Sequence, residues 1–112
     1  MRKLASIQKI KSLTPIPNAD RIELARVLGW KCVVKKGEFK VGDKCVYIEI
    51  DSIPPSDNPV FDFLKHSNGK MDRVKTIKLR GQISQGLAMP VNLFDGLEKY
   101  NVGDDVTKVL GI

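Results

Sequence analysis

The sequence is poor in the residues that build metal centres, disulfide frameworks and nucleophilic active sites. It contains two cysteines, Cys32 and Cys45, and one histidine, His66. The cysteines have neither Cys-x-x-Cys nor Cys/His metal spacing, so we expect two buried free thiols, the usual state in a reducing compartment. No serine, cysteine or carboxylate motif accompanies His66, and Glu49 and Asp51 are better explained as a solvated strand end than as cation ligands. We therefore assign no catalytic residue and no metal site.

Long apolar runs are absent and aromatic residues are scarce. No stretch approaches the ~20 apolar residues that a membrane helix needs, and no signal-peptide core opens the chain. The sequence therefore predicts a soluble, cytoplasmic protein. Only 6% of the residues are aromatic, so we do not expect base stacking to be the main source of affinity for a nucleic acid.

Basic residues outnumber acidic ones and are unevenly distributed. The 19 Lys and Arg and 13 Asp and Glu give a net charge of +6. Residues 1–44 carry a net charge of +7 and residues 73–81 one of +4, whereas the rest of the chain sums to −5. Two basic blocks on an acidic background predict a cationic patch that attracts polyanions. Charge alone is explained nearly as well by lysines that keep a small domain soluble.

Short strand-like runs separated by turn residues dominate the chain. The expected strands occupy residues 3–13, 22–28, 30–35, 45–51, 73–80 with its continuation 82–89, and 106–110. The first is expected to bend, the fourth to have one solvent-facing side, and a short helix to begin near Asn58-Pro59. A chain of 112 residues is expected to form a single domain over 1–112. The order predicts an all-β, five- to six-stranded OB-fold barrel with one short helix between strands 3 and 4, and an SH3-like barrel is the alternative.

Polar and apolar residues alternate from Thr76 to Ser84. In a strand, alternate residues lie on opposite faces, so the pattern predicts that Ile77, Leu79 and Ile83 enter a core while the polar series faces outward. Lysine and arginine would bind phosphates there, and glutamine and serine would bind bases or a 2′-hydroxyl group. The leading predicted contact residues are Lys78, Arg80, Gln82, Ser84 and Gln85. The competing explanation is a solvated outer face.

Other residues are candidates for the same surface. Trp30 could stack on a base, although its spacing with Leu28, Cys32 and Val34 favours the core. Asn18 and Arg21 are candidate contacts for which a local turn is the simpler explanation. The residues expected to add phosphate contacts are Lys31, Lys35, Lys36 and Lys75.

Several motifs together make the full length of the chain resemble a known family. They are Pro17-Asn18-Ala19-Asp20-Arg21, Val33-Val34-Lys35-Lys36-Gly37, Val46-Tyr47-Ile48-Glu49-Ile50-Asp51 and Leu79-Arg80-Gly81-Gln82-Ile83-Ser84-Gln85-Gly86-Leu87. With them the chain resembles the N-terminal OB-fold module of the Deinococcus-type RNA ligases. The first and last motifs, taken singly, are also similar to the tRNA-binding OB domains attached to some aminoacyl-tRNA synthetases.

The resemblance implies that a nucleotidyltransferase domain, which uses ATP and a divalent cation, follows such a module and seals RNA ends. Its Lys-x-Asp-Gly motif is missing here, and the nearest segment, Lys70-Met71-Asp72-Arg73, has arginine in place of glycine. We therefore expect no cofactor in this chain and no enzymatic activity of the chain alone. The implied partners are RNA or an RNA-containing duplex and a ligase domain in cis, and the chain is expected to be monomeric.

Two other functions stay open at this point. The module could serve mainly to dock onto its ligase domain. It could also resemble the tRNA-binding domains in acting as a dimerising adaptor, in which case Phe61, Phe63 or Leu97 would form an exposed partner surface.

Overall fold

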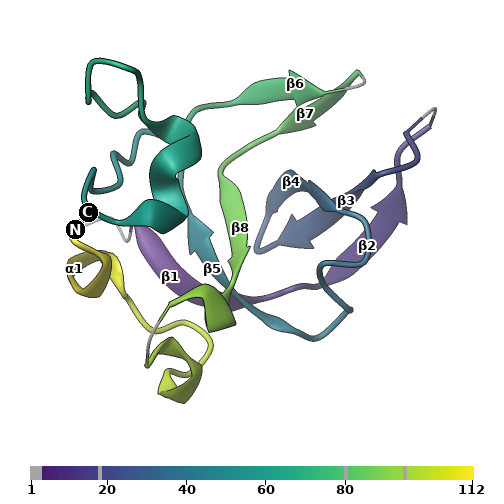
Figure 1. The fold of residues 1–112 in the computed structure, drawn as a ribbon. Helices are drawn as coiled ribbons and strands as arrows, with labels where there is room; N and C mark the ends of the chain where they lie inside the picture. Colours follow the sequence, from purple (N-terminus) through teal and green to yellow (C-terminus); the bar gives the residue numbers. More distant parts are fainter. Residues whose placement is uncertain (1–3, 18, 80, 95) are drawn as a thin grey trace.

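Two three-stranded antiparallel sheets and a short hairpin form the β structure (Figure 1). The computed structural model describes residues 4–17, 19–79, 81–94 and 96–112. The sheets have the strand orders β1-β5-β8 and β2-β3-β4, and β6 pairs with β7. The strands are β1 (Ala5–Lys9), β2 (Ser12–Pro15), β3 (Ile22–Val27), β4 (Trp30–Lys35), β5 (Lys44–Ile48), β6 (Ile77–Leu79), β7 (Gln82–Ser84) and β8 (Leu87–Pro90).

The two sheets are connected at both sides. On one side β1 runs into β2, which confirms the predicted bent strand and extends it to Pro15. On the other side β4 meets β7: the Gln85 amide donates to the Lys31 carbonyl oxygen at 2.8 Å, and the Val33 amide donates to the Ser84 hydroxyl oxygen at 2.9 Å. The connections give the predicted all-β OB-fold barrel.

Short helices fill the connections. The expected helix is a 3-10 helix, η1 (Pro59–Leu64), whose first turn is capped by the Asn58 side chain at 3.1 Å from the Val60 amide. The helix lies between β5 and β6. If the bent pair β1-β2 is counted as one strand, the helix follows the fourth strand, whereas it was expected after the third. The connection after the third strand, residues 36–43, instead forms turns in which Gly37 and Gly42 have positive φ angles. Within the described part of the chain, no helix is long and apolar enough to cross a membrane.

The C-terminal third contains three more short helices. They are η2 (Val91–Leu93), η3 (Leu97–Lys99) and α1 (Thr107–Leu110). The strand expected over 106–110 is therefore wrong. The Asp105 carboxylate accepts from the Thr107 amide at 3.0 Å, which favours a helical turn, and Gly111 ends it with a φ of 77°.

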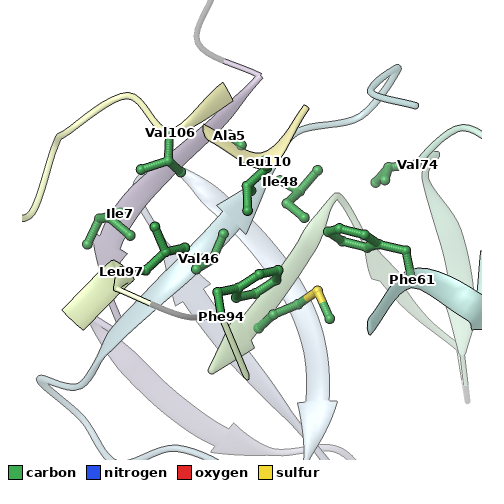
Figure 2. Packing of buried hydrophobic residues seen from close by; sticks show 11 residues of the cluster. Ala5, Ile7, Val46, Ile48, Phe61, Val74, Phe94, Leu97, Val106 and Leu110 are labelled. Atoms are coloured by element: carbon green, nitrogen blue, oxygen red, sulfur yellow. The ribbon is translucent and has the colours of Figure 1, made fainter. Parts of the chain in front are cut away.

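Two hydrophobic clusters form the core, and β5 contributes to both. Val46 and Ile48 belong to the cluster with β1, η1 and the C-terminal helices (Figure 2), and Cys45 and Tyr47 belong to the cluster with β3 and β4. The expectation that β5 has a solvent-facing side is therefore wrong, because a separate cluster covers each face.

Four residues with predicted burial states lie in these clusters. Cys32 and Cys45 are buried free thiols, as predicted, and burial raises the pKa of each to about 12. Phe61 and Leu97 are also buried in the core, so their predicted place on a partner surface is wrong. Both sit on short 3-10 helices that turn them inward (Figure 2).

Candidate nucleic-acid interface

The outer face of the β2-β3-β4 sheet carries a polar hollow. Ala25 and Val27 on β3 and Cys32 and Val34 on β4 enter the core, so the alternate residues of these strands face outward. The cross-strand register places Arg26 opposite both Ser12 and Lys31. The hollow has a volume of about 230 Å³ and is lined by Ser12, Thr14, Leu24, Arg26 and Lys31.

A second hollow lies beside the first, between the β3–β4 turn and the β6–β7 hairpin. Its volume is about 370 Å³, and its lining is Gly29, Lys31, Gly81, Gln82, Ile83 and Gln85. Lys31 lines both hollows, so it stands between them. The hydrogen bond from the Gln85 amide to the Lys31 carbonyl oxygen holds the two edges together.

Two cations lie directly opposite each other on this surface. Arg26 on β3 and Lys31 on β4 are cross-strand partners, and both are exposed. Like charges in this position destabilise a sheet. No carboxylate among the described residues forms an ion pair with either side chain. The pair is therefore an electrostatic site suited to a phosphate group, and the Ser12 and Thr14 hydroxyl groups add hydrogen-bonding capacity beside it.

The structure gathers only part of the predicted contact set around this surface. Lys31, Gln82 and Gln85 line the second hollow. Lys78 pairs with Ile83, so it lies on the hairpin face opposite to Gln82 and Ser84. The shared face predicted for these three residues is therefore wrong. Because β6 and β7 are antiparallel and two residues separate them, even-numbered residues of β6 share a face with odd-numbered residues of β7.

The predicted role of Ser84 as an outward contact is also wrong. Its side chain is 3% exposed, and its hydroxyl oxygen accepts the hydrogen bond from the Val33 amide. Two residues that were predicted to enter the core from the same hairpin do not: Ile77 is 44% exposed and Ile83 is 51% exposed. The two-stranded hairpin projects from the barrel (Figure 1), which leaves about half of each of these two side chains exposed.

The remaining candidates lie elsewhere. Lys35, Lys36 and Arg21 lie at the end of β4 away from Lys31, where the Lys36 amide donates to the Arg21 carbonyl oxygen at 2.9 Å. Trp30 packs against the second core cluster, which supports the core interpretation that its spacing favoured. Lys75 is exposed in the segment before β6. Arg80 and Asn18 lie outside the described residues.

Sequence reasoning missed three residues with polar or charged side chains that line the hollows: Ser12, Thr14 and Arg26. A signal for Arg26 was present, because this charged residue interrupts the even-numbered apolar residues Ile22, Leu24 and Leu28. An arginine at that position indicates that the even-numbered face of β3 meets solvent. Ser12 and Thr14 had no such signal. They follow the bend between β1 and β2, where the alternation of the first strand no longer predicts which face a residue occupies.

Comparisons with known proteins agree with this fold. A family model described as an OB-fold domain matches residues 4–91. No curated protein matches the chain. Among solved structures, the RNA ligase of Naegleria gruberi with PPi is 46% identical, with a TM-score of 0.89 and coverage of 99% of this chain and 34% of that chain. A mutant of that ligase with AMP and Mn is 47% identical, with a TM-score of 0.88 and coverage of 98% and 34%. The chain thus spans about a third of the length of these ligases.

Proposed function

This chain belongs to the OB-fold domain family, and from that premise we propose that it is the RNA-binding module of an RNA ligase. RNA would lie across the outer face of β2, β3 and β4 and reach the β6–β7 hairpin. The similarity to the Naegleria gruberi RNA ligase, over nearly the whole of this chain, supports RNA as the nucleic acid. In OB-folds, the face of the second and third strands, which are β3 and β4 here, is a common site for oligonucleotides.

The observation that carries the proposal is the place of Lys31. It stands between two adjoining hollows and opposite Arg26, with no ion-pair partner among the described residues. A phosphate at this pair would be flanked by hydroxyl groups on one side and by the Gln82 and Gln85 side chains on the other. Hydroxyl and amide groups can bind a 2′-hydroxyl group or a base edge.

The composition of the two hollows indicates how the affinity arises. None of the described residues that line them is aromatic. Stacking of unpaired bases on rings therefore contributes little here, and the backbone phosphates supply most of the binding free energy. Binding should weaken steeply with salt, with a change in log–log slope of about 0.7 for each phosphate contact on a single strand.

In this proposal the module, one OB-fold domain over residues 1–112, binds and positions RNA but does not seal it. ATP and the divalent cation would belong to the nucleotidyltransferase domain of the ligase, with which the module acts in cis. Lys35, Lys36, Lys75 and Lys78 would extend the electrostatic attraction at longer range, outside the central contact at Arg26 and Lys31.

The test compares two double variants with the same loss of charge. Arg26→Ala/Lys31→Ala removes the central pair, whereas Lys40→Ala/Lys70→Ala removes two exposed lysines that line neither hollow. Fluorescence anisotropy with a labelled RNA, at several salt concentrations, should show a loss of affinity of at least about tenfold for the first variant. Its log–log salt slope should also fall by about 1.4. Equal losses in the two variants would reduce the effect to net charge and remove the site.

A further inference from the structure

An apolar groove opens along β4, outside the two polar hollows. Val33 and Lys35 place one side of it on the outer face of β4. It lies between β4, β8, η1 and η2 and has a volume of about 440 Å³. Its apolar lining includes Val33, Val60, Phe63, Leu87, Met89 and Leu93. None of these six residues lines either of the two polar hollows.

A second depression adjoins the groove, and Leu93 lines both. That depression has a volume of about 250 Å³ and reaches α1, where Val109 lines it. Three of the side chains along this path are largely exposed: Phe63 at 61%, Leu93 at 49% and Val109 at 55%. Three different short helices therefore place large apolar side chains along these two adjoining depressions.

The groove differs from the two polar hollows in its charge. Among the residues that the structure describes, its charged lining is one lysine and one glutamate, Lys35 and Glu38. Burial raises the pKa of Glu38, and the positive charge of Lys35 acts against that rise. A neutral, apolar depression in a chain of net charge +6 does not attract a polyanion. Exposed aromatic and aliphatic side chains gathered at one place are typical of a protein interface.

We propose that this groove, centred on Phe63 and Leu93, is the docking surface for the nucleotidyltransferase domain of the ligase. The inference rests on the proposed function. The matched ligases are about three times as long as this chain, so about two thirds of each of them lies outside the matched module. Phe63 is the natural anchor, because buried aromatic side chains dominate the binding free energy of interfaces. A tethered domain also needs little affinity, since linkage raises its effective concentration.

The test uses a chimera in which this chain replaces the matching third of the Naegleria gruberi RNA ligase. Phe63→Ser/Leu93→Ser is compared with Ile53→Ser/Val102→Ser, which removes two exposed apolar residues that do not line the groove. Small-angle X-ray scattering should show a compact parent, a larger radius of gyration for the groove variant and no change for the control. RNA sealing by the groove variant should slow by at least about tenfold.

Further measurements separate this proposal from the proposed function. The 112-residue chain with Phe63→Ser/Leu93→Ser should bind RNA as the unaltered chain does, whereas Arg26→Ala/Lys31→Ala in the chimera should leave the scattering profile unchanged. An extended parent chimera, or a groove variant that stays compact and seals at the parent rate, would overturn the docking site. Light scattering of the chain alone should give a monomer. A dimer that Phe63→Ser dissociates would show that a second copy occupies the groove and would overturn the proposal.

Discussion

The Tyr47 hydroxyl group donates a 2.6 Å hydrogen bond to the carbonyl oxygen of Gln85. This contact ties the buried strand β5 to the two residues between β7 and β8, where the chain passes from the projecting hairpin back into the barrel. The following residue, Gly86, lies so close to Tyr47 that a side chain would not fit. The contact therefore fixes the position of Gln85 beside Lys31.

Replacing Gly86 with alanine should destabilise the fold strongly. The added Cβ would lie 2.6 Å from the Tyr47 hydroxyl oxygen and 2.7 Å from the Ile48 carbonyl oxygen, at a φ of +85° that disfavours any side chain. We expect a loss of about 2–4 kcal/mol in the free energy of unfolding, measured by urea denaturation. Gly37→Ala is the control, since Gly37 has a φ of +83° and open space around it, and it should cost about 1 kcal/mol. Equal losses in the two variants would show that the positive φ angle, and not the contact with Tyr47, accounts for the effect of Gly86→Ala.

Ser84 and Ser12 should respond in opposite ways to replacement by alanine. Ser84→Ala leaves the Val33 amide without its acceptor, and we expect a loss of about 1–3 kcal/mol in the free energy of unfolding. Ser12 lines the outer hollow, so Ser12→Ala should leave stability within about 0.5 kcal/mol and weaken RNA binding. Urea denaturation and anisotropy on the same preparations test both. The structural role of Ser84 would be wrong if Ser84→Ala lowered the RNA affinity without lowering the free energy of unfolding.

The two buried cysteines should make stability depend on alkaline pH. The pKa of each thiol rises from 9.0 to about 12 on folding, so the native state keeps protons that the unfolded state loses. The stabilisation is complete below pH 9 and is lost as the pH rises towards 12, at up to about 1.4 kcal/mol per thiol per pH unit. Cys32→Ala/Cys45→Ala should flatten this fall between pH 8 and pH 10.5 in urea titrations. A parallel decline in both proteins would rule out the thiols as its source.

Lys44 should contribute to stability through its ammonium group. Its Nζ atom donates to the carbonyl oxygens of Glu98 at 2.7 Å and Tyr100 at 2.9 Å, which attaches η3 to the start of β5. Lys44→Met keeps most of the aliphatic stem and should cost about 1.5–3 kcal/mol, the range for hydrogen bonds to a charged group. Lys40→Met on the exposed turn is the matched control. A thermal melting temperature that falls equally in both variants would contradict this role.

Local features of the fold could be predicted from the sequence. The strands of the first hairpin, the bend in the first strand and the capped turn at Asn58 depend on neighbouring residues, and each lies close to its predicted position. The buried state of both cysteines followed in the same way from the apolar runs around them. These features need no knowledge of distant contacts.

The orientation of side chains could not be predicted in the same way. In the β3–β4 hairpin, Ala25 lies opposite Cys32, so an odd-numbered residue of β3 shares a face with an even-numbered residue of β4. An apolar pattern read on even-numbered residues through both strands therefore assigns one of the two strands to the wrong face. The same rule places Lys78 away from Gln82. The interface residues Ser12 and Arg26 are brought together only by the pairing of β2 with β3. Register is a property of the paired strands, and no single segment encodes it.

Because β5 supplies alternate side chains to both hydrophobic clusters, neither half of the barrel can open while the other stays intact. Detaching β1 or β8 would uncover Val46 and Ile48, and detaching the β3–β4 hairpin would uncover Tyr47, so each opening breaks contacts along the same segment. The protein should therefore unfold in one cooperative step, with the slowest amide hydrogen exchange along Lys44–Ile48.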